Sequence, residues 1–367
     1  MDLTLDQLDN IKIHFIVARA RTGSTLLSTM LNQNKNMLST IEEPFAYFLY
    51  PRYHKVTNWT SKTIDDYCKD FFLFSHGKLF FQFGTKEELK EILEQYKADL
   101  NYARAIRLSY LCFFPTKDKS EISTVVNKQL IMGNYLSRMA KIFPESNFLF
   151  LYRNPLDSLP RVKNQRLKKF NRSVGFYDLA VEWFYDYFLI LNKKKKILSK
   201  RILDIYYEEL IFHSEIELKR VCEFLNVSYE DIMVTYSDNI NSKEVVDDLK
   251  TVRKNEQRFK YEKKVLLDMH EGLFVRPDAN KVGKWKESIS RAEADIIWSI
   301  CGSTAEEIGY KKDEIISKDK PSILFYFHLL KYFVKNRIVT IIWYSSPFFV
   351  KRFLKVIKKK FLKQKED

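Results

Sequence analysis

The stretch that most constrains this chain is residues 11–31, where a short apolar run ends in a glycine-containing turn and a helix-like pattern follows. The apolar run predicts a buried strand, and the leucines after the turn recur at helical spacing. In a strand–turn–helix unit the first helical N–H groups point toward the turn, where the helix dipole adds partial positive charge. The sequence therefore predicts that this turn binds a phosphate or a sulfate group.

The residue types in the turn suit an anion. Gly23 would let the backbone approach a ligand closely, and Arg21 offers a full positive charge with several donors. Thr22, Ser24 and Thr25 add hydroxyl groups. The alternative is that Thr22 or Ser24 simply caps a helix after a strand. The turn lacks the Gly-Lys pair of a Walker A loop, and the chain has no G-x-G-x-x-G fingerprint.

Strand-like runs alternate with longer stretches of helical periodicity along the chain. This alternation predicts an α/β fold with a P-loop-like, mostly parallel sheet flanked by helices. Ligands of such sheets bind beyond the C-terminal ends of the strands, which is where Arg21 and Arg153 lie in the sequence. The expected strands are residues 11–17, 123–126, 147–152 and 202–206, and the clearest helices are residues 85–96, 136–143, 177–191 and 215–225.

Composition narrows the function classes. A hydrophobic content of 46% and an aromatic content of 15% argue for a packed core and against disorder. The four cysteines are far apart and form no Cys-x-x-Cys pair, and the six histidines show no ligand spacing. We therefore expect neither a disulfide framework nor a metal site.

A second motif lies at residues 143–155, where the sequence FPESNFLFLYRNP places Arg153 directly after a strand. Paired with RTGSTLL at residues 21–27, it resembles the sulfotransferases that use 3′-phosphoadenosine 5′-phosphosulfate (PAPS). Three further blocks match in the family's order: VVNKQ around Lys128, residues 206–230, and residues 280–310. The resemblance covers about residues 11–311, and five ordered blocks make it specific.

The resemblance implies how the donor would be held. Arg153 would bind the 3′-phosphate of PAPS, and Arg21 would also stabilise charge on the leaving group. The family usually has a serine eight residues after the motif arginine, but this chain has Arg161 there. Arg161 could bind the phosphate bidentately, and Ser158 is the other candidate. The residues expected around the 5′-phosphosulfate are Arg21, Thr22, Gly23, Ser24, Thr25 and Leu26.

The acceptor hydroxyl must lose its proton, and a glutamate is the expected base. Glu42-Glu43-Pro44 follows the first helix at about the place where carbohydrate and protein-tyrosine sulfotransferases carry a catalytic glutamate. Several carbohydrate enzymes have Glu-Pro there, which favours Glu43; the alternative is two solvated carboxylates in a loop. Lys128 is a further catalytic candidate that could reach the transferred group, and a surface lysine beside a strand is its alternative.

The end of the chain differs from the rest. Residues 321–367 carry eleven Lys or Arg and two acidic residues, a net charge of +9 out of +15 for the whole chain. Val350, Leu354, Ile357 and Phe361 are spaced as one face of a helix, with lysines on the others. We therefore expect a sulfotransferase domain over residues 1–313 and a basic amphipathic helical tail over residues 314–367. The tail would bind an anionic membrane surface, or else pack on its own domain or a second subunit.

No signal peptide is expected from the acidic N-terminus, and the longest apolar run is short for a membrane span, so we expect a cytoplasmic protein peripheral to the membrane. The predicted function is PAPS-dependent sulfuryl transfer to a hydroxyl of a glycan, lipid or small molecule, without a metal. One alternative is a P-loop nucleotide phosphotransferase; another is a polyanion-binding protein acting through the tail, with nucleic acid disfavoured. Acceptor contacts are expected from residues 45–120 and 231–275.

Overall fold

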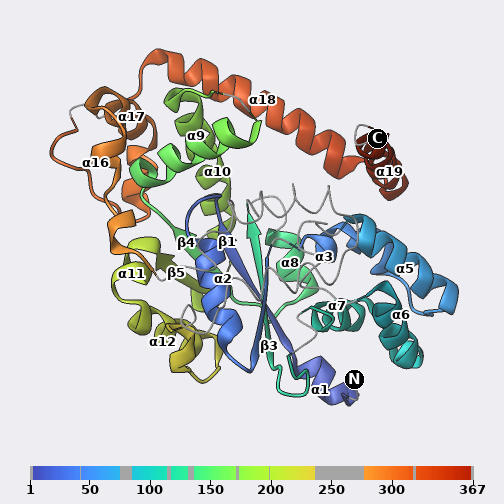
Figure 1. Ribbon diagram of the computed structural model, residues 1–367. Helices are drawn as coiled ribbons and strands as arrows, with labels where there is room; N and C mark the ends of the chain where they lie inside the picture. Colours follow the sequence, from blue (N-terminus) through green and yellow to red (C-terminus); the bar gives the residue numbers. More distant parts are fainter. Residues whose placement is uncertain are drawn as a thin grey trace.

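A five-stranded sheet forms the centre of the molecule, with strand order β2-β3-β1-β4-β5 (Figure 1). The structure is a computed structural model that describes residues 3–41, 43–74, 85–113, 117–130, 136–170, 173–197, 199–235, 277–316 and 320–364. Each of the four strand pairings is parallel. The strands are β1 (Lys12–Ala18), β2 (Met37–Ile41), β3 (Thr124–Leu130), β4 (Phe148–Tyr152) and β5 (Ile202–Tyr206).

Apolar residues of the strands supply two cores, one on each face of the sheet. Ile16 and Leu149 belong to the core beneath the helix that follows β1, whereas Phe15 and Phe148 belong to the larger core on the opposite face. Because neighbours along a strand point to opposite faces, a strand buried on both faces is mostly apolar. This explains why β4 and the apolar part of β1, residues 15–18, could be recognised in the sequence.

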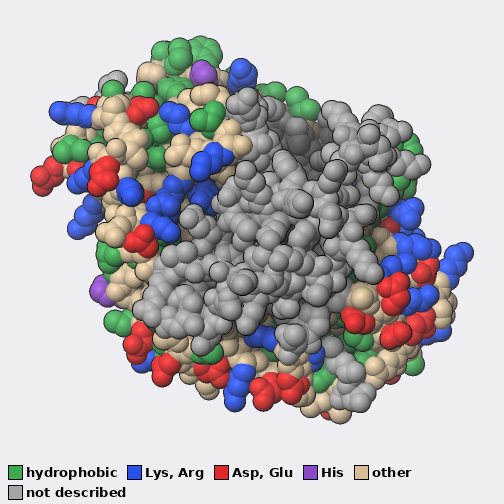
Figure 2. Space-filling model, in the orientation of Figure 1, with side chains coloured by type: hydrophobic (Ala, Val, Ile, Leu, Met, Phe, Trp, Pro, Cys, Tyr) green, Lys and Arg blue, Asp and Glu red, His purple; other side chains and the backbone are tan. Residues whose placement is uncertain are grey.

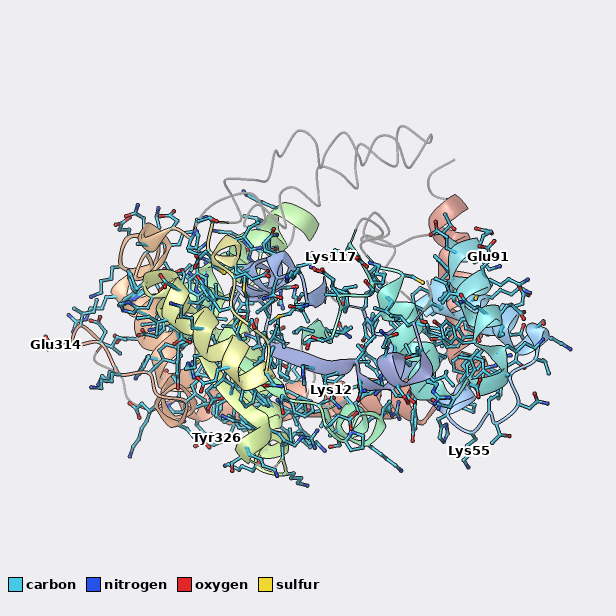
Figure 3. All side chains as sticks on the ribbon, turned by 90° about the horizontal axis from the view of Figure 1, so that it is seen from below. Lys12, Lys55, Glu91, Lys117, Glu314 and Tyr326 are labelled. Atoms are coloured by element: carbon cyan, nitrogen blue, oxygen red, sulfur yellow. The ribbon has the colours of Figure 1, made fainter. Side chains whose placement is uncertain are left out.

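Helices cover both faces of the sheet. One core is completed by α2, α11 and α12, and the other by helices that include α7, α9, α10 and α17. Figure 3 views the sheet from its N-terminal edge, with Lys12 of β1 near the centre and helices on either side. The helices are α1 (Leu5–Asn10), α2 (Ser24–Gln33), α3 (Phe45–Phe48), α4 (Tyr50–Tyr53), α5 (Ser61–Phe74), α6 (Lys86–Gln95), α7 (Tyr102–Leu111), α8 (Leu136–Ile142), α9 (Pro155–Phe170), α10 (Phe176–Lys194), α11 (Tyr207–Phe212), α12 (Ser214–Leu225), α16 (Trp285–Ser288), α17 (Arg291–Glu307), α18 (Ile323–Ser345) and α19 (Phe348–Gln364).

The parallel α/β architecture confirms the fold class predicted from the sequence, including its C-terminal helical extension. Each expected strand and helix is present with ends shifted by a few residues. β2 was not expected from the sequence, because Ser39 and Thr40 interrupt the apolar run of this edge strand. Of residues 45–120, expected to supply acceptor contacts, the described part up to residue 111 is largely helical. Most of the second expected segment, residues 231–275, lies outside the described part of the chain.

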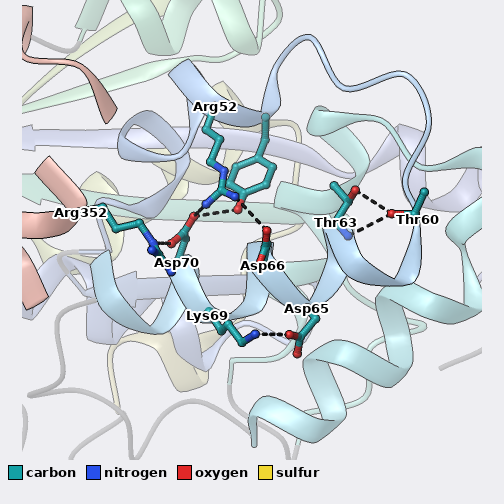
Figure 4. A network of polar contacts seen from close by, with 9 residues as sticks. Arg52, Thr60, Thr63, Asp65, Asp66, Lys69, Asp70 and Arg352 are labelled. Atoms are coloured by element: carbon teal, nitrogen blue, oxygen red, sulfur yellow. Dashed lines mark hydrogen bonds and ion pairs between the residues drawn. The ribbon is translucent and has the colours of Figure 1, made fainter. Parts of the chain in front are cut away.

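The two C-terminal helices pack on the domain at both ends of their path. In Figure 1, α18 crosses the upper part of the molecule, toward which the C-terminal ends of the strands point. Phe325 of α18 is buried against Phe184 of α10. At the other end, Arg352 of α19 donates to the buried carboxylate of Asp70 on α5, 2.7 Å away, where Arg52 also binds (Figure 4). Among the described residues, no helix combines the length and apolarity that crossing a bilayer would require.

Candidate functional site

The loop between β1 and α2 has the backbone geometry of an anion-binding turn. Arg21 and Gly23 both have left-handed backbone conformations, with φ of 68° and 91°. Gly23 is the N-cap of α2, and no side chain caps this helix, so the simple-cap interpretation of Thr22 or Ser24 does not hold. The Thr22 hydroxyl instead donates to the backbone carbonyl of Arg19, 2.8 Å away. Ser24, Thr25 and Leu26 form the first turn of α2, whose N–H groups face the loop.

Tyr207, the first residue of α11, packs tightly beneath this loop. A Cβ atom added to Gly23 would lie 2.3 Å from Cδ2 of the tyrosine ring, so the loop can adopt this position only with glycine. The guanidinium carbon of Arg153 lies 3.9 Å from the centroid of the same ring. Tyr207 is buried and belongs to the core. It therefore sets the spacing between the loop and Arg153.

Arg153 follows β4 and is brought directly to the loop. Its Nη1 donates to the carbonyl oxygen of Arg21 at 3.3 Å, and its Nη2 donates to the carbonyl oxygen of Lys281 at 2.8 Å. Only 2% of Arg153 is exposed, and its Nε has no hydrogen-bond partner among the described residues. Burial and the neighbouring positive charge of Arg161 lower the pKa of Arg153. An anion bound here would stabilise the charged form of Arg153 and so oppose both of these causes.

Arg161 lies with Arg153, and Ser158 does not take an equivalent position. Nη2 of Arg161 donates to the same Lys281 carbonyl oxygen, at 3.2 Å. The Ser158 hydroxyl is buried and directed at the carbonyl oxygen of Pro155, 3.5 Å away, within the first turn of α9. The two arginines thus converge on one backbone atom, and they form a compact cationic pair.

Two carboxylates that the sequence analysis missed fix the backbone around these arginines. Asp157 accepts hydrogen bonds from the N–H groups of Gly283 and Trp285, at 2.8 and 3.0 Å, so it ties the segment that follows Lys281 to α9. Glu208 accepts from the N–H of Asn154 at 3.1 Å, and burial raises its pKa. Aspartate is common in the first turn of a helix because it interacts favourably with the helix dipole. The sequence alone therefore gave no reason to single out Asp157.

Lys128 is buried at the same edge of the sheet. It pairs in register with Ile16 of β1, and its ammonium group donates to the hydroxyl of Thr25 at 3.0 Å. Only 2% of the residue is exposed, so the interpretation as a surface lysine is wrong. The structure therefore places a second cation against the first turn of α2.

Glu43 is also buried, with 2% exposure, so it is not a solvated loop carboxylate. Its backbone carbonyl accepts a hydrogen bond of 2.9 Å from the side-chain amide of Asn127, which precedes Lys128 on β3. The Thr40 hydroxyl donates to Oδ1 of Asn127 at 3.2 Å. Asn127 thus links the segment around Glu43 to the strand that carries Lys128. Glu42 lies outside the described residues.

A buried ion pair connects the start of the loop to α10. Arg19, the first residue after β1, donates from Nε to Asp186 of α10 at 2.7 Å, and both side chains are nearly inaccessible. Figure 2 shows further Lys and Arg side chains gathered on the side of the molecule where α9, α16 and α11 lie. Among the described residues, no group of His, Cys, Asp or Glu side chains is placed to hold a metal ion.

Comparisons with known proteins agree on one family. A sequence model described as "Sulfotransferase family" matches residues 14–231. The chain is 23% identical to the protein-tyrosine sulfotransferase of Drosophila melanogaster over 132 residues, which is 36% of this chain and 26% of that protein. It is 26% identical to protein-tyrosine sulfotransferase 2 of Gallus gallus over 127 residues, 34% of this chain and 33% of that protein. The matched segment thus spans about a third or less of these relatives.

Solved structures with a similar arrangement include two sulfotransferase domains. The domain from the Synechococcus PCC 7002 olefin synthase has a TM-score of 0.49 and 18% identity, covering 82% of this chain and 96% of that one. The domain from the curacin biosynthetic pathway has a TM-score of 0.48 and 17% identity, covering 82% of this chain and 99% of that one.

Proposed function

Because this chain belongs to the sulfotransferase family, we propose that it transfers the sulfuryl group of PAPS in line to the hydroxyl group of an acceptor, with Glu43 as the general base. The observation that carries the proposal is the hydrogen bond from Arg153 to the carbonyl oxygen of Arg21. It joins the loop after β1 to the end of β4, so one nucleotide can bind both motifs.

The chemistry of the residues fits a nucleotide with two anionic ends. Arg153 is a buried cation whose Nε is directed at no partner among the described residues, and Arg161 stands beside it. Both would hold the 3′-phosphate of PAPS. We assign Arg161, rather than Ser158, as the substitute for the family's usual serine, because the Ser158 hydroxyl is directed at Pro155. A guanidinium fork can bind phosphate through two parallel hydrogen bonds.

The other end of the nucleotide would lie at the loop. The N–H groups of Gly23, Ser24, Thr25 and Leu26 would bind the oxygens of the 5′-phosphosulfate. Arg21 and Thr22 form the rest of this loop. PAPS would supply the sulfuryl group, and 3′-phosphoadenosine 5′-phosphate would be the leaving group. Arg21 and Lys128 would hold positive charge where negative charge grows during transfer, and Lys128 is already positioned at Thr25.

Glu43 would accept the proton of the acceptor hydroxyl. Glu43 is 2% exposed, so its carboxylate lies inside the domain, where a positioned carboxylate can act as a general base. Asn127 would act as a positioning residue, because its amide fixes the backbone carbonyl of Glu43. The expected acceptors are glycans, lipids and small molecules. The protein-tyrosine sulfotransferases among the relatives add the phenolic hydroxyl of a protein as a class to test.

The proposal is tested by incubating the protein with PAPS that carries radiolabelled sulfate and with fractionated lipid, glycan, small-molecule and protein pools. We expect label to move into one pool with the wild type and not with Glu43→Gln. Calorimetry with 3′-phosphoadenosine 5′-phosphate and with ATP tests the donor site separately. Tighter binding of ATP, or label in no pool, would contradict the proposal and favour a phosphotransferase or a binding protein.

A further inference from the structure

We infer that α18 and α19 form a docking surface for an anionic lipid bilayer, a role separate from sulfuryl transfer. We call this the tail surface: the solvent-exposed apolar side chains of the two helices together with the basic residues among them. The inference rests on which faces of these helices the domain covers, which the sequence could not reveal.

α18 is apolar on two opposite faces, and the described part of the domain packs on only one of them. The covered face contains Phe325, which packs on Phe184, and Tyr332, which packs on Tyr185. The bare face begins at Ile323 and continues at intervals of three or four residues, so its members form one stripe along the helix. These residues are Ile323, Phe327, Leu330, Val334 and Ile338, between 46% and 76% exposed.

α19 also carries exposed aromatic side chains. Phe349 is 71% exposed and Phe353 is 63% exposed, one helical turn apart, whereas Phe348 packs on Phe74 of α5. The stripe expected from the sequence through Val350 and Leu354 is therefore offset from the most exposed one. Tyr326 of α18 is also 62% exposed, and Figure 3 places it at the outer edge of the molecule.

The packed face of α19 holds the helix in place. Arg352 binds one oxygen of Asp70, a carboxylate with no exposed surface, and the Tyr53 hydroxyl donates to the other at 2.8 Å (Figure 4). The contact anchors α19 to a carboxylate that Arg52 also binds, so the packed side of this helix has a defined place on the domain. The exposed aromatic residues are thus presented by a fixed helix, and the surface needs no rearrangement to bind.

Charge identifies the occupant of the tail surface. Residues 321–365 contain eleven Lys or Arg residues and no acidic residue. Lys351 is buried and Arg352 is paired with Asp70, whereas Lys331 is exposed between Leu330 and Val334 on α18. Apolar side chains flanked by basic ones match the boundary between acyl chains and anionic headgroups. A second copy of this chain would bring the same acid-free surface against itself, and like charges in an interface oppose association.

Vesicle sedimentation of the full chain tests the inference. We expect the wild type to sediment with vesicles of phosphatidylglycerol and phosphatidylcholine, and at least tenfold less with phosphatidylcholine alone. The double variant Phe327→Ser/Leu330→Ser should lose at least tenfold in partitioning to the anionic vesicles. The matched control is Phe212→Ser/Ile216→Ser, which changes two apolar residues of similar exposure outside the tail and should bind as the wild type does. Point variants are preferred to tail deletion because the covered face packs on the domain.

Circular dichroism and thermal melting confirm that each variant is folded, and light scattering reports the oligomeric state. The inference is overturned if the wild type does not sediment with anionic vesicles, or if the double serine variant sediments equally well. It is also overturned if the wild type is a dimer that the double serine variant converts to a monomer, because the tail surface would then be a subunit interface. None of these measurements involves PAPS, so they leave the proposed enzymatic function untouched.

Discussion

Nη1 of Arg153 donates a hydrogen bond to the backbone carbonyl of Arg21 across 3.3 Å, although the two residues are 132 positions apart in the chain. The contact exists because β1 and β4 are parallel neighbours whose C-terminal ends meet at one edge of the sheet. Tyr207 follows β5, the neighbour of β4 in the sheet, and it contacts both Gly23 and Arg153. Each part of the candidate donor site therefore depends on the other two.

Removing either arginine should weaken binding of the nucleotide product 3′-phosphoadenosine 5′-phosphate. We expect Arg21→Ala and Arg153→Ala each to lower affinity by about 10- to 100-fold, since a hydrogen bond to a charged group contributes about 1.5–3 kcal/mol. Calorimetry measures the effect. Arg104→Ala is the matched control, because that arginine binds Asp9 on a different part of the domain. Wild-type affinity in Arg21→Ala would show that the loop assignment is wrong.

Substituting Gly23 should disrupt the loop. Gly23→Ala forces a Cβ atom into the ring of Tyr207 and places alanine at a φ of 91°, so we expect a loss of about 2–4 kcal/mol in the free energy of unfolding and no detectable donor binding. Gly175→Ala is the control, because a Cβ atom there meets nothing within 4 Å, and it should cost about 1 kcal/mol or less. Urea denaturation compares the two, and equal stability would contradict the close packing on Tyr207.

Glu43→Gln should separate binding from catalysis. The amide keeps the size of the buried side chain but cannot accept a proton, so we expect turnover to fall by at least about 100-fold. The affinity for 3′-phosphoadenosine 5′-phosphate should remain within about twofold of the wild type, which corresponds to less than about 0.5 kcal/mol. Initial rates and calorimetry on the same preparation give both values. Unchanged turnover would remove Glu43 as the base.

Asn127→Asp should lower kcat without weakening donor binding. The aspartate can still accept the hydrogen bond from Thr40, but it has no amide to donate to the carbonyl of Glu43. A small displacement of a reacting group lowers the rate by up to about 100-fold, and we expect a loss of about 10- to 100-fold here. Steady-state kinetics at saturating donor measure kcat. A variant that matched the wild type would show that Asn127 does not position Glu43.

Stability should fall in acid partly because of His14 on β1. Burial, assisted by the positive charges of Lys12 and Arg201, lowers the pKa of His14 to about 4. Its Nδ1 accepts a hydrogen bond of 2.9 Å from the N–H of Asn147, which requires the neutral ring. Below the unfolded pKa of about 6.5 the unfolded chain binds the extra proton, so the free energy of unfolding decreases as the pH drops toward the folded value.

The histidine contribution can be isolated by substitution. Between pH 7 and pH 4.5 the His14 term should remove about 2–3 kcal/mol from the free energy of unfolding. His14→Gln keeps an acceptor for Asn147 but does not titrate, so its stability should depend less on pH by about that amount. Denaturant unfolding at the two pH values measures the difference. The same pH dependence in both proteins would contradict the assignment.

The sequence by itself determined the features that local pattern encodes. β4 is a continuous apolar run and β1 ends in one, followed by the loop at Arg21, so this strand, turn and helix could be placed from local sequence. Both arginine motifs could also be located at strand ends. An edge strand such as β2 carries a weaker signal because it needs less apolar surface, and it was missed.

Only the tertiary structure decided which side chains meet. Asp157, Asn127 and Asp186 have no distinctive local sequence, because their function depends on partners more than 80 residues away. The burial of Lys128 and Glu43 likewise depends on packing between elements that are distant in the chain. The same reason applies to the tail, where α18 is apolar on both faces and, among the described residues, the position of α10 decides which face is covered.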